Sequence, residues 1–98
     1  MKKLIRITAV TCAALWVAGA AVADCYADYK AKRDNPLQLH YGVIELPQQA
    51  CASTGAAQDL IATRIAVDDW TLLNVLDIFG EDGLAERRES AGRYFLRY

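Results

Sequence analysis

The first 23 residues constrain the fold more than any other part of the chain, because they have the three parts of an export signal. Three basic side chains lie within the first six residues, an almost wholly apolar stretch covers residues 7–20, and small alanines occupy positions 21 and 23. We expect cleavage after Ala23, which leaves 75 residues, 24–98. That length suits a single small domain and excludes a Rossmann fold, a barrel or a repeat array.

The compartment follows from the form of this signal. A short basic region directly after Met1 is typical of bacterial export, so we expect a periplasmic or secreted protein with no membrane association after cleavage. The alternative is an uncleaved membrane anchor, since the apolar run is just short of the ~18–20 residues that span a bilayer.

Charge limits the kind of partner. Cleavage would leave eight basic and twelve acidic residues, a net charge of −4. A protein that binds nucleic acid generally needs a basic excess, because it must displace counterions from phosphates. We therefore expect no nucleic-acid partner.

The cysteines predict a covalent cross-link. Cys12 lies within the signal, so the mature chain keeps only Cys25 and Cys51. An even pair in an oxidising compartment indicates a disulfide, and a catalytic redox pair is disfavoured because such cysteines are usually close in sequence, as in Cys-x-x-Cys. Two cysteines and the single histidine, His40, have no metal-ligand spacing, so we expect no metal and no cofactor.

The mature chain divides into short elements at its proline, glycine and capping residues. Asp24 can cap a helix over residues 24–33, whose last residues are basic, and Pro36 stops it. Beyond Pro36 the pattern predicts a strand over 37–46, a helix over 55–67 after the caps Ser53 and Thr54, a strand over 70–79, a short charged helix over 81–90 and a closing strand over 93–98.

These elements assemble most economically as an α+β domain: a small three-stranded sheet with the 55–67 helix on its apolar face, a short N-terminal helix and one disulfide. We expect the 37–46 and 70–79 strands to be parallel and the last two strands antiparallel. Residues 70–79 are apolar on both faces, which is typical of a central strand. In residues 37–46 the apolar face carries Leu39, Tyr41 and Val43, whereas His40 and Gly42 fall on the other.

Two stretches carry a resemblance to known proteins: Asp69-Trp70-Thr71-Leu72-Leu73 and Gly92-Arg93-Tyr94-Phe95-Leu96-Arg97-Tyr98. With them, residues 37–98 resemble a loose group of small bacterial domains of unknown function that have a strand, a helix, a Trp-led strand and a closing aromatic strand. The resemblance covers about two-thirds of the chain and implies a fold but no activity. The N-terminal helix with Cys25 and the long charged connection 80–92 depart from the group.

His40 is the only histidine, and so the only side chain that ordinarily titrates near neutral pH. Catalysis would require a carboxylate such as Asp77 beside it, and no nucleophile motif accompanies it. We expect a half-exposed strand histidine and no enzyme. Trp70 could be a stacking platform, but at the start of an apolar strand it is expected to be a core residue.

The arginines near the C-terminus suggest a second kind of site. Arginine forks bind phosphate and carboxylate in a bidentate manner, so a small-anion pocket could form from five residues. These candidates are His40, Arg87, Arg88, Arg93 and Arg97. The alternative is that neighbouring acidic residues pair with the same arginines.

Aromatic residues are numerous for so short a chain, and five of them are tyrosines. A domain this small cannot bury them all, and exposed aromatic rings beside arginines suit a protein–protein contact. The closing strand 93–98 could also be a sheet edge that pairs with a partner or with itself. The leading interpretation is a non-enzymatic, exported protein-interaction module, with a protein partner or a homodimer. The alternative is a small-anion-binding protein.

Overall fold

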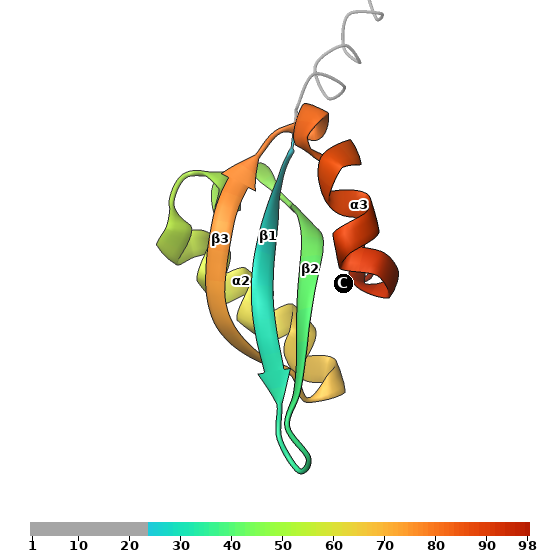
Figure 1. Ribbon diagram of the computed structural model, residues 1–98. Helices are drawn as coiled ribbons and strands as arrows, with labels where there is room; N and C mark the ends of the chain where they lie inside the picture. Colours follow the sequence, from blue (N-terminus) through green and yellow to red (C-terminus); the bar gives the residue numbers. More distant parts are fainter. Residues whose placement is uncertain (1–23) are drawn as a thin grey trace, which may run out of the picture.

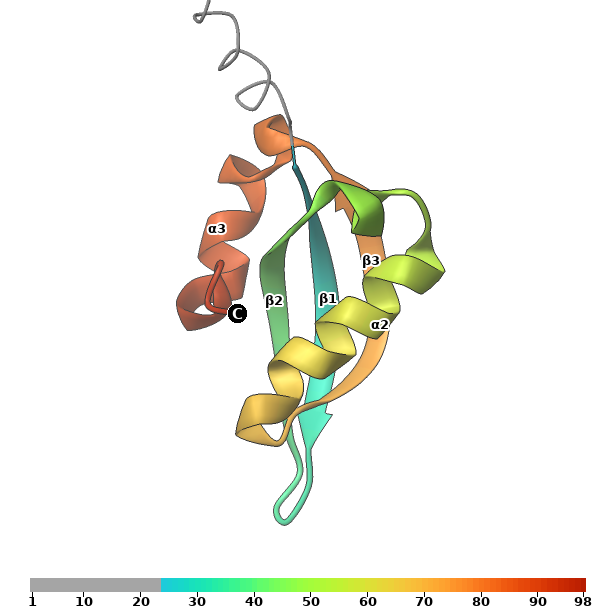
Figure 2. The same cartoon turned by 180° about the vertical axis from the view of Figure 1, so that it is seen from behind.

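The computed structural model describes residues 24–98; the expected signal peptide, 1–23, lies outside the described residues. The fold is α+β: a three-stranded antiparallel sheet in the order β2-β1-β3, with α2 packed across one face and α3 beside β2 (Figures 1 and 2). The strands are β1 (Cys25–Arg33), β2 (Gln38–Leu46) and β3 (Thr71–Phe79), and the α-helices are α2 (Thr54–Ile65) and α3 (Ala85–Ala91).

The expected N-terminal helix over residues 24–33 is wrong, since this segment is strand β1 and forms the centre of the sheet. Its local composition favours a helix, but alternate residues are the ones that become fully buried: Ala27, Tyr29 and Ala31. A burial period of two is that of a strand, and a helix would have turned these residues to different sides. The two alanines also leave room for α2 on this face.

Strand β2 forms where residues 37–46 predict it, and it pairs with β1 as a hairpin that places Arg33 opposite Gln38 and Cys25 opposite Leu46. The expected orientation of its faces is wrong. The inner face, which we define as the face covered by α2, carries His40 and Gly42, whereas Leu39 on the outer face is exposed. The reason is cross-strand fit, because Gly42 lies opposite the bulky Tyr29 ring.

Gly42 is required by this close approach. A Cβ atom at residue 42 would lie 2.6 Å from Cζ of Tyr29 and 2.5 Å from its hydroxyl oxygen. Tyr29 is fully buried, so its ring has little freedom to move away. Glycine at 42 therefore allows the largest fully buried side chain, that of Tyr29, to pack against β2.

Helix α2 confirms the helix predicted over 55–67, although it ends at Ile65 and a short 3-10 turn, η4 (Ala66–Asp68), follows. The Ser53 hydroxyl oxygen accepts a hydrogen bond from the Ala56 amide at 3.1 Å, as expected for an N-cap. Ala57, Ile61 and Ile65 form its buried stripe. This stripe packs on the inner face of the sheet and closes the core.

Strand β3 confirms the predicted strand 70–79 but not its expected central position, because it pairs only with β1 and lies at the edge of the sheet. Leu72, Val75 and Ile78 pack against the core. The pairing with β1 shifts register twice, and Leu73 and Leu76 are the residues left without a partner. β2 and β3 do run in the same direction, as predicted, but β1 lies between them.

The C-terminal region differs from the expected helix and strand. The charged connection contains a 3-10 turn, η5 (Glu81–Gly83), and then α3, a shorter helix than the 81–90 segment predicted. Residues 93–98 do not form the expected closing strand: η6 (Gly92–Tyr94) is a 3-10 turn, followed by an isolated parallel bridge between Phe95 and Val43. We call residues 92–98 the C-terminal segment.

The disulfide between Cys25 and Cys51 is confirmed, with the two Cα atoms 6.0 Å apart. The hairpin brings the cysteines together, since Cys25 lies opposite Leu46 and η3 (Gln48–Cys51) then returns the chain toward β1. The cross-link therefore closes the hairpin at its open end.

Candidate functional site

The only histidine lies at the centre of an aromatic cluster on the inner face: Tyr29, His40, Trp70, Tyr94 and Tyr98. The ring of His40 stacks on Tyr94 with centroids 3.7 Å apart and planes 11° apart, and the edge of Trp70 meets it at 4.2 Å. His40 is only 8% exposed, so the expected half-exposed histidine is wrong. Trp70 is a core residue, as predicted. Strand β2 and the C-terminal segment thus share one packed cluster.

The electrostatic surroundings of His40 favour the neutral ring. Its Nε2 lies 2.9 Å from the Tyr29 hydroxyl, and its Nδ1 is buried without a hydrogen-bond partner. Burial, with a smaller contribution from the Arg33 guanidinium, lowers the pKa of His40 to about 4. The ring is therefore uncharged near neutral pH. Asp77 is the carboxylate that a catalytic pair with His40 would require. It lies opposite Asp28 on the outer face of the sheet and pairs with Arg87, so it does not contact His40.

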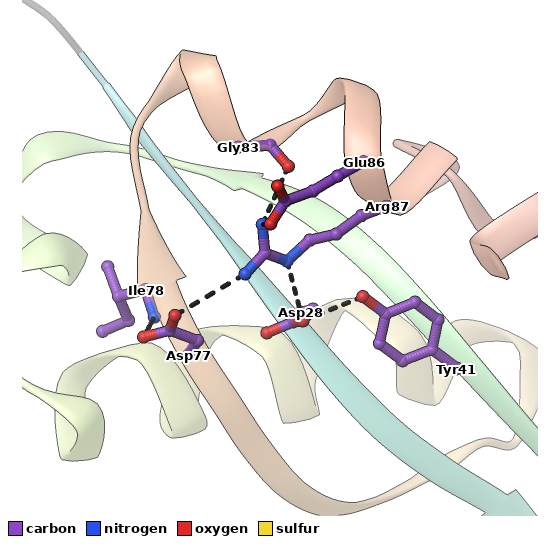
Figure 3. A network of polar contacts seen from close by, with 7 residues as sticks. All are labelled: Asp28, Tyr41, Asp77, Ile78, Gly83, Glu86 and Arg87. Atoms are coloured by element: carbon purple, nitrogen blue, oxygen red, sulfur yellow. Dashed lines mark hydrogen bonds and ion pairs between the residues drawn. The ribbon is translucent and has the colours of Figure 1, made fainter. Parts of the chain in front are cut away.

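A buried ion pair ties α3 to the outer face of the sheet (Figure 3). Asp28, on β1, is 6% exposed. One of its carboxylate oxygens accepts hydrogen bonds from Arg87 Nε at 3.0 Å and from the Tyr41 hydroxyl at 2.8 Å. Arg87 also reaches Asp77 at 3.6 Å and Glu86 at 3.0 Å. Helix α3 is therefore anchored across β1 and β3 by a single guanidinium.

The pKa values of this group follow from the contacts. The hydrogen bond to Asp28 raises the pKa of Arg87, and burial together with its bond to Asp28 raises the pKa of Tyr41 to about 12. Both groups keep their ordinary charge at all physiological pH values. The arrangement is thus a structural tie rather than an acid–base pair.

The arginines proposed for an anion pocket do not meet at one point. Arg87 is occupied by carboxylates, and the other three each lie over a neighbouring aromatic ring. The guanidinium-to-centroid distances are 4.5 Å for Arg88 over Phe95, 5.6 Å for Arg93 over Tyr94 and 5.7 Å for Arg97 over Tyr98. The anion-site hypothesis stays a prediction, and these contacts give it little support because the rings rather than a shared cavity receive the guanidinium groups.

One surface hollow does bring two arginines together. Arg64 and Arg97 line a cavity of about 320 Å³, but Asp24 and Glu45 line it as well. The side-chain hydrogen bond with Asp24 raises the pKa of Glu45, so the two acids lie close to one another. Carboxylates in the same cavity oppose the binding of an anion.

The outer face and the β3 edge remain open. In Figure 1 the front of the sheet is uncovered over β1 and β3, while α3 lies beside β2. On β3, Leu73 is 49% and Leu76 is 44% exposed. Leu73 also lines a groove of about 280 Å³ with Lys30, Leu39 and Tyr41. This open edge and the outer groove expose three leucines of the described sheet, Leu39, Leu73 and Leu76.

Sequence reasoning missed Asp28, Tyr41 and Arg33 as important residues. Asp28 holds Arg87 and Tyr41, and the Arg33 guanidinium lies 4.2 Å from the centroid of Trp70. The signal that could have found them is the two-residue alternation of residues 25–33, which places Asp28 on the face opposite the buried alanines.

No protein family, curated protein or solved structure matches the chain. The resemblance to small strand–helix domains therefore stays a prediction. In the part of the chain that the structure describes, no helix is long and apolar enough to cross a bilayer.

Proposed function

We propose that this chain is an exported, non-enzymatic interaction domain that forms a homodimer through the free edge of β3. Two copies would pair antiparallel across a two-fold axis and join their sheets into one of six strands. The observation that carries the proposal is the open edge itself: nine residues of strand that pair on one side only, with exposed leucines along them.

The chemistry of β3 supports pairing with a second copy. Its backbone N–H and C=O groups on the free side have no partner strand within the described residues, which makes the edge a template for another strand. Leu73 and Leu76 are available for burial against the partner. Sheet edges that must stay free are usually protected by charged side chains, and β3 carries just one charged residue, Asp77.

Charge does not oppose this arrangement. In an antiparallel pair centred on Val75, Asp77 of one copy lies opposite Leu73 of the other. The two Asp77 carboxylates are then four positions apart along the strand, about 13 Å, at 3.3 Å per residue. That separation exceeds the Debye length of ~8 Å at physiological ionic strength, so their repulsion is largely screened.

Export is supported by the disulfide and by the form of the first 23 residues. Measurement of the intact mass of the protein, purified from the periplasm or the culture medium, tests the proposed export. We expect a chain that begins at Asp24 and lacks two hydrogens because Cys25 and Cys51 are joined. A mass that includes Met1, or two free thiols, would contradict it.

Light scattering coupled to size-exclusion chromatography tests the dimer. We expect twice the monomer mass for the wild type and the monomer mass for Leu73→Lys/Leu76→Lys, since two buried cations would oppose strand pairing. Leu37→Lys is the matched control: Leu37 is 64% exposed but lies in the β1–β2 turn, so this variant should remain dimeric. A monomeric wild type would mean that the two bulges protect the edge, and the proposal would be wrong.

A further inference from the structure

We propose that the C-terminal segment is an acid-released cover over the edge of β2, and that His40 is the group whose protonation releases it. This device acts at the opposite edge of the sheet from β3, so it does not depend on the proposed dimer. It would make the exposure of the β2 backbone a function of the pH around the protein.

The cover is held by few contacts. The Leu96 amide donates a hydrogen bond of 2.8 Å to the Val43 carbonyl of β2, and this bond belongs to an isolated bridge. The Tyr98 hydroxyl donates a bond of 2.7 Å to Asp68. The rest of the attachment is side-chain packing: Tyr94 stacks on His40 and meets Trp70 edge-on at 5.8 Å, and Phe95 lies under the Arg88 guanidinium. A segment with so few backbone bonds can open without unfolding the domain.

His40 lies where burial disfavours a proton for as long as the segment is closed. Near neutral pH the ring is uncharged, and both the stack on Tyr94 and the bond with Tyr29 are compatible with that state. A protonated ring would carry an N–H at Nδ1, which is buried and has no acceptor. Lifting the segment removes Tyr94 from one face of the ring and admits water to it. The open state therefore binds the proton more readily than the closed state.

The charged groups around His40 do not offset this cost. From β1, Arg33 adds positive charge and Tyr29 offers only a hydroxyl. The C-terminal segment contributes the tyrosines Tyr94 and Tyr98 and the arginines Arg93 and Arg97, whose guanidinium groups lie over those two rings. The carboxylate in this network is that of Asp68 on η4, and it accepts a hydrogen bond from Tyr98 rather than from His40. Within residues 24–98, no acidic side chain is bonded to His40.

Linkage fixes the direction and size of the effect. Burial lowers the pKa of His40 to about 4 when the segment is closed, and for the open state, in which water reaches the ring, we take the ordinary value of 6.5. As pH falls through this window, protons favour the open state. The ratio of open to closed molecules should rise roughly twentyfold from pH 7 to pH 5, and by about 100-fold at pH 4.

Amide hydrogen exchange in the disulfide-bonded protein tests the proposal. The readout is the protection of the Leu96 amide, divided by its intrinsic exchange rate at each pH, with the amides of the β1–β2 ladder as an internal reference for global unfolding. We expect Leu96 protection to fall roughly twentyfold from pH 7 to pH 5 relative to the ladder. Protection of Leu96 that stays constant relative to the ladder would overturn the proposal.

Two variants identify the titrating group. His40→Phe keeps a ring to stack on Tyr94 but cannot take up a proton, so Leu96 protection should become independent of pH. Asp68→Asn keeps the size of the Tyr98 acceptor but removes the carboxylate that is bonded to the C-terminal segment, and it should retain the response. The reverse result would assign the effect to Asp68 and contradict the role of His40.

A spectroscopic measurement keeps the test valid if His40→Phe does not fold. The chain has one histidine, so the ring-proton signal of His40 can be followed by nuclear magnetic resonance in the wild type. We expect a midpoint well below 6.5, with Leu96 protection already falling at pH values above that midpoint. A midpoint at or above 6, or a titration with no change at Leu96, would overturn the proposal.

Discussion

The two edge strands of this sheet, β2 and β3, differ in what covers them. At β2 the chain adds α3 and the C-terminal segment, which bonds to Val43 through the Leu96 amide. At β3 it adds nothing within the described residues, and two bulges leave Leu73 and Leu76 accessible. Our proposal interprets this difference as one edge that the chain covers itself and one edge that is left for association. Substitutions on the β2 side should therefore cost stability, and those on the β3 side should change assembly.

The largest effect is expected from Arg87→Ala. This change leaves the buried carboxylate of Asp28 without its cation, and we expect a loss of about 4 kcal/mol in the free energy of unfolding. Glu86→Gln is the matched control, because Glu86 is 72% exposed and its pair with the same arginine should contribute less than ~0.5 kcal/mol. Urea unfolding followed by circular dichroism measures both. Equal losses would show that Asp28 does not depend on Arg87.

The second-largest loss of stability is expected from Cys25→Ser/Cys51→Ser. The bridge closes a loop across a sequence separation of 26 residues, and its loss should lower the free energy of unfolding by about 3 kcal/mol in the chain-entropy model. Urea unfolding of the oxidised wild type and the double variant gives the difference. The single variant Cys51→Ser separates the loss of the bridge from the effect of replacing both side chains. A difference below ~1 kcal/mol would mean that the hairpin needs no covalent tie.

Gly42→Ala should have an intermediate effect. The added methyl group must displace the buried Tyr29 ring, and overpacking of this kind costs about 2 kcal/mol. Gly55→Ala is the control, because a Cβ there has no atom nearer than 4.0 Å, and the exposed α2 position favours alanine. In thermal unfolding, Gly42→Ala should lower the melting temperature and Gly55→Ala should raise it. A neutral Gly42→Ala would show that Tyr29 can move.

The smallest change in stability is expected at the open edge. Leu73→Lys alone should alter the free energy of unfolding of the monomer by less than ~0.5 kcal/mol, because half of the side chain is already exposed. Urea unfolding at protein concentrations below the dissociation constant of the dimer measures this effect on folding separately from any effect on assembly. A loss above ~1 kcal/mol would place Leu73 in the monomer's own core and weaken the contrast between the two edges.

The sequence predicted the parts of the fold that depend on local pattern. The strand before Pro47, the helix after Ser53 and the apolar run that begins at Trp70 were each correctly identified, since caps, prolines and runs of apolar residues act locally. The cysteine pairing also followed from composition and compartment. These features need no knowledge of which segments become neighbours.

The rest required tertiary information. Residues 25–33 have helix-compatible side chains, and only their insertion between β2 and β3 makes the two-residue alternation dominate. That one error led to the others. With β1 left out of the sheet, β3 was predicted to be the central strand and residues 93–98 were predicted to form an edge strand. For the candidate site, His40 was singled out for its chemistry, but its burial under Tyr94 depends on a C-terminal segment whose path no local pattern indicates.

The strand order β2-β1-β3 has a consequence for the order of events during folding. The hairpin joins residues that are near in sequence, whereas Tyr26 must find Phe79, more than fifty residues further along the chain. Closing the longer loop costs more chain entropy and is intrinsically slower. Both cysteines and both hairpin strands are complete by residue 51, so oxidation can lock this unit while β3 is still unpaired. The disulfide-bonded hairpin is then a preformed template with which β3 can pair.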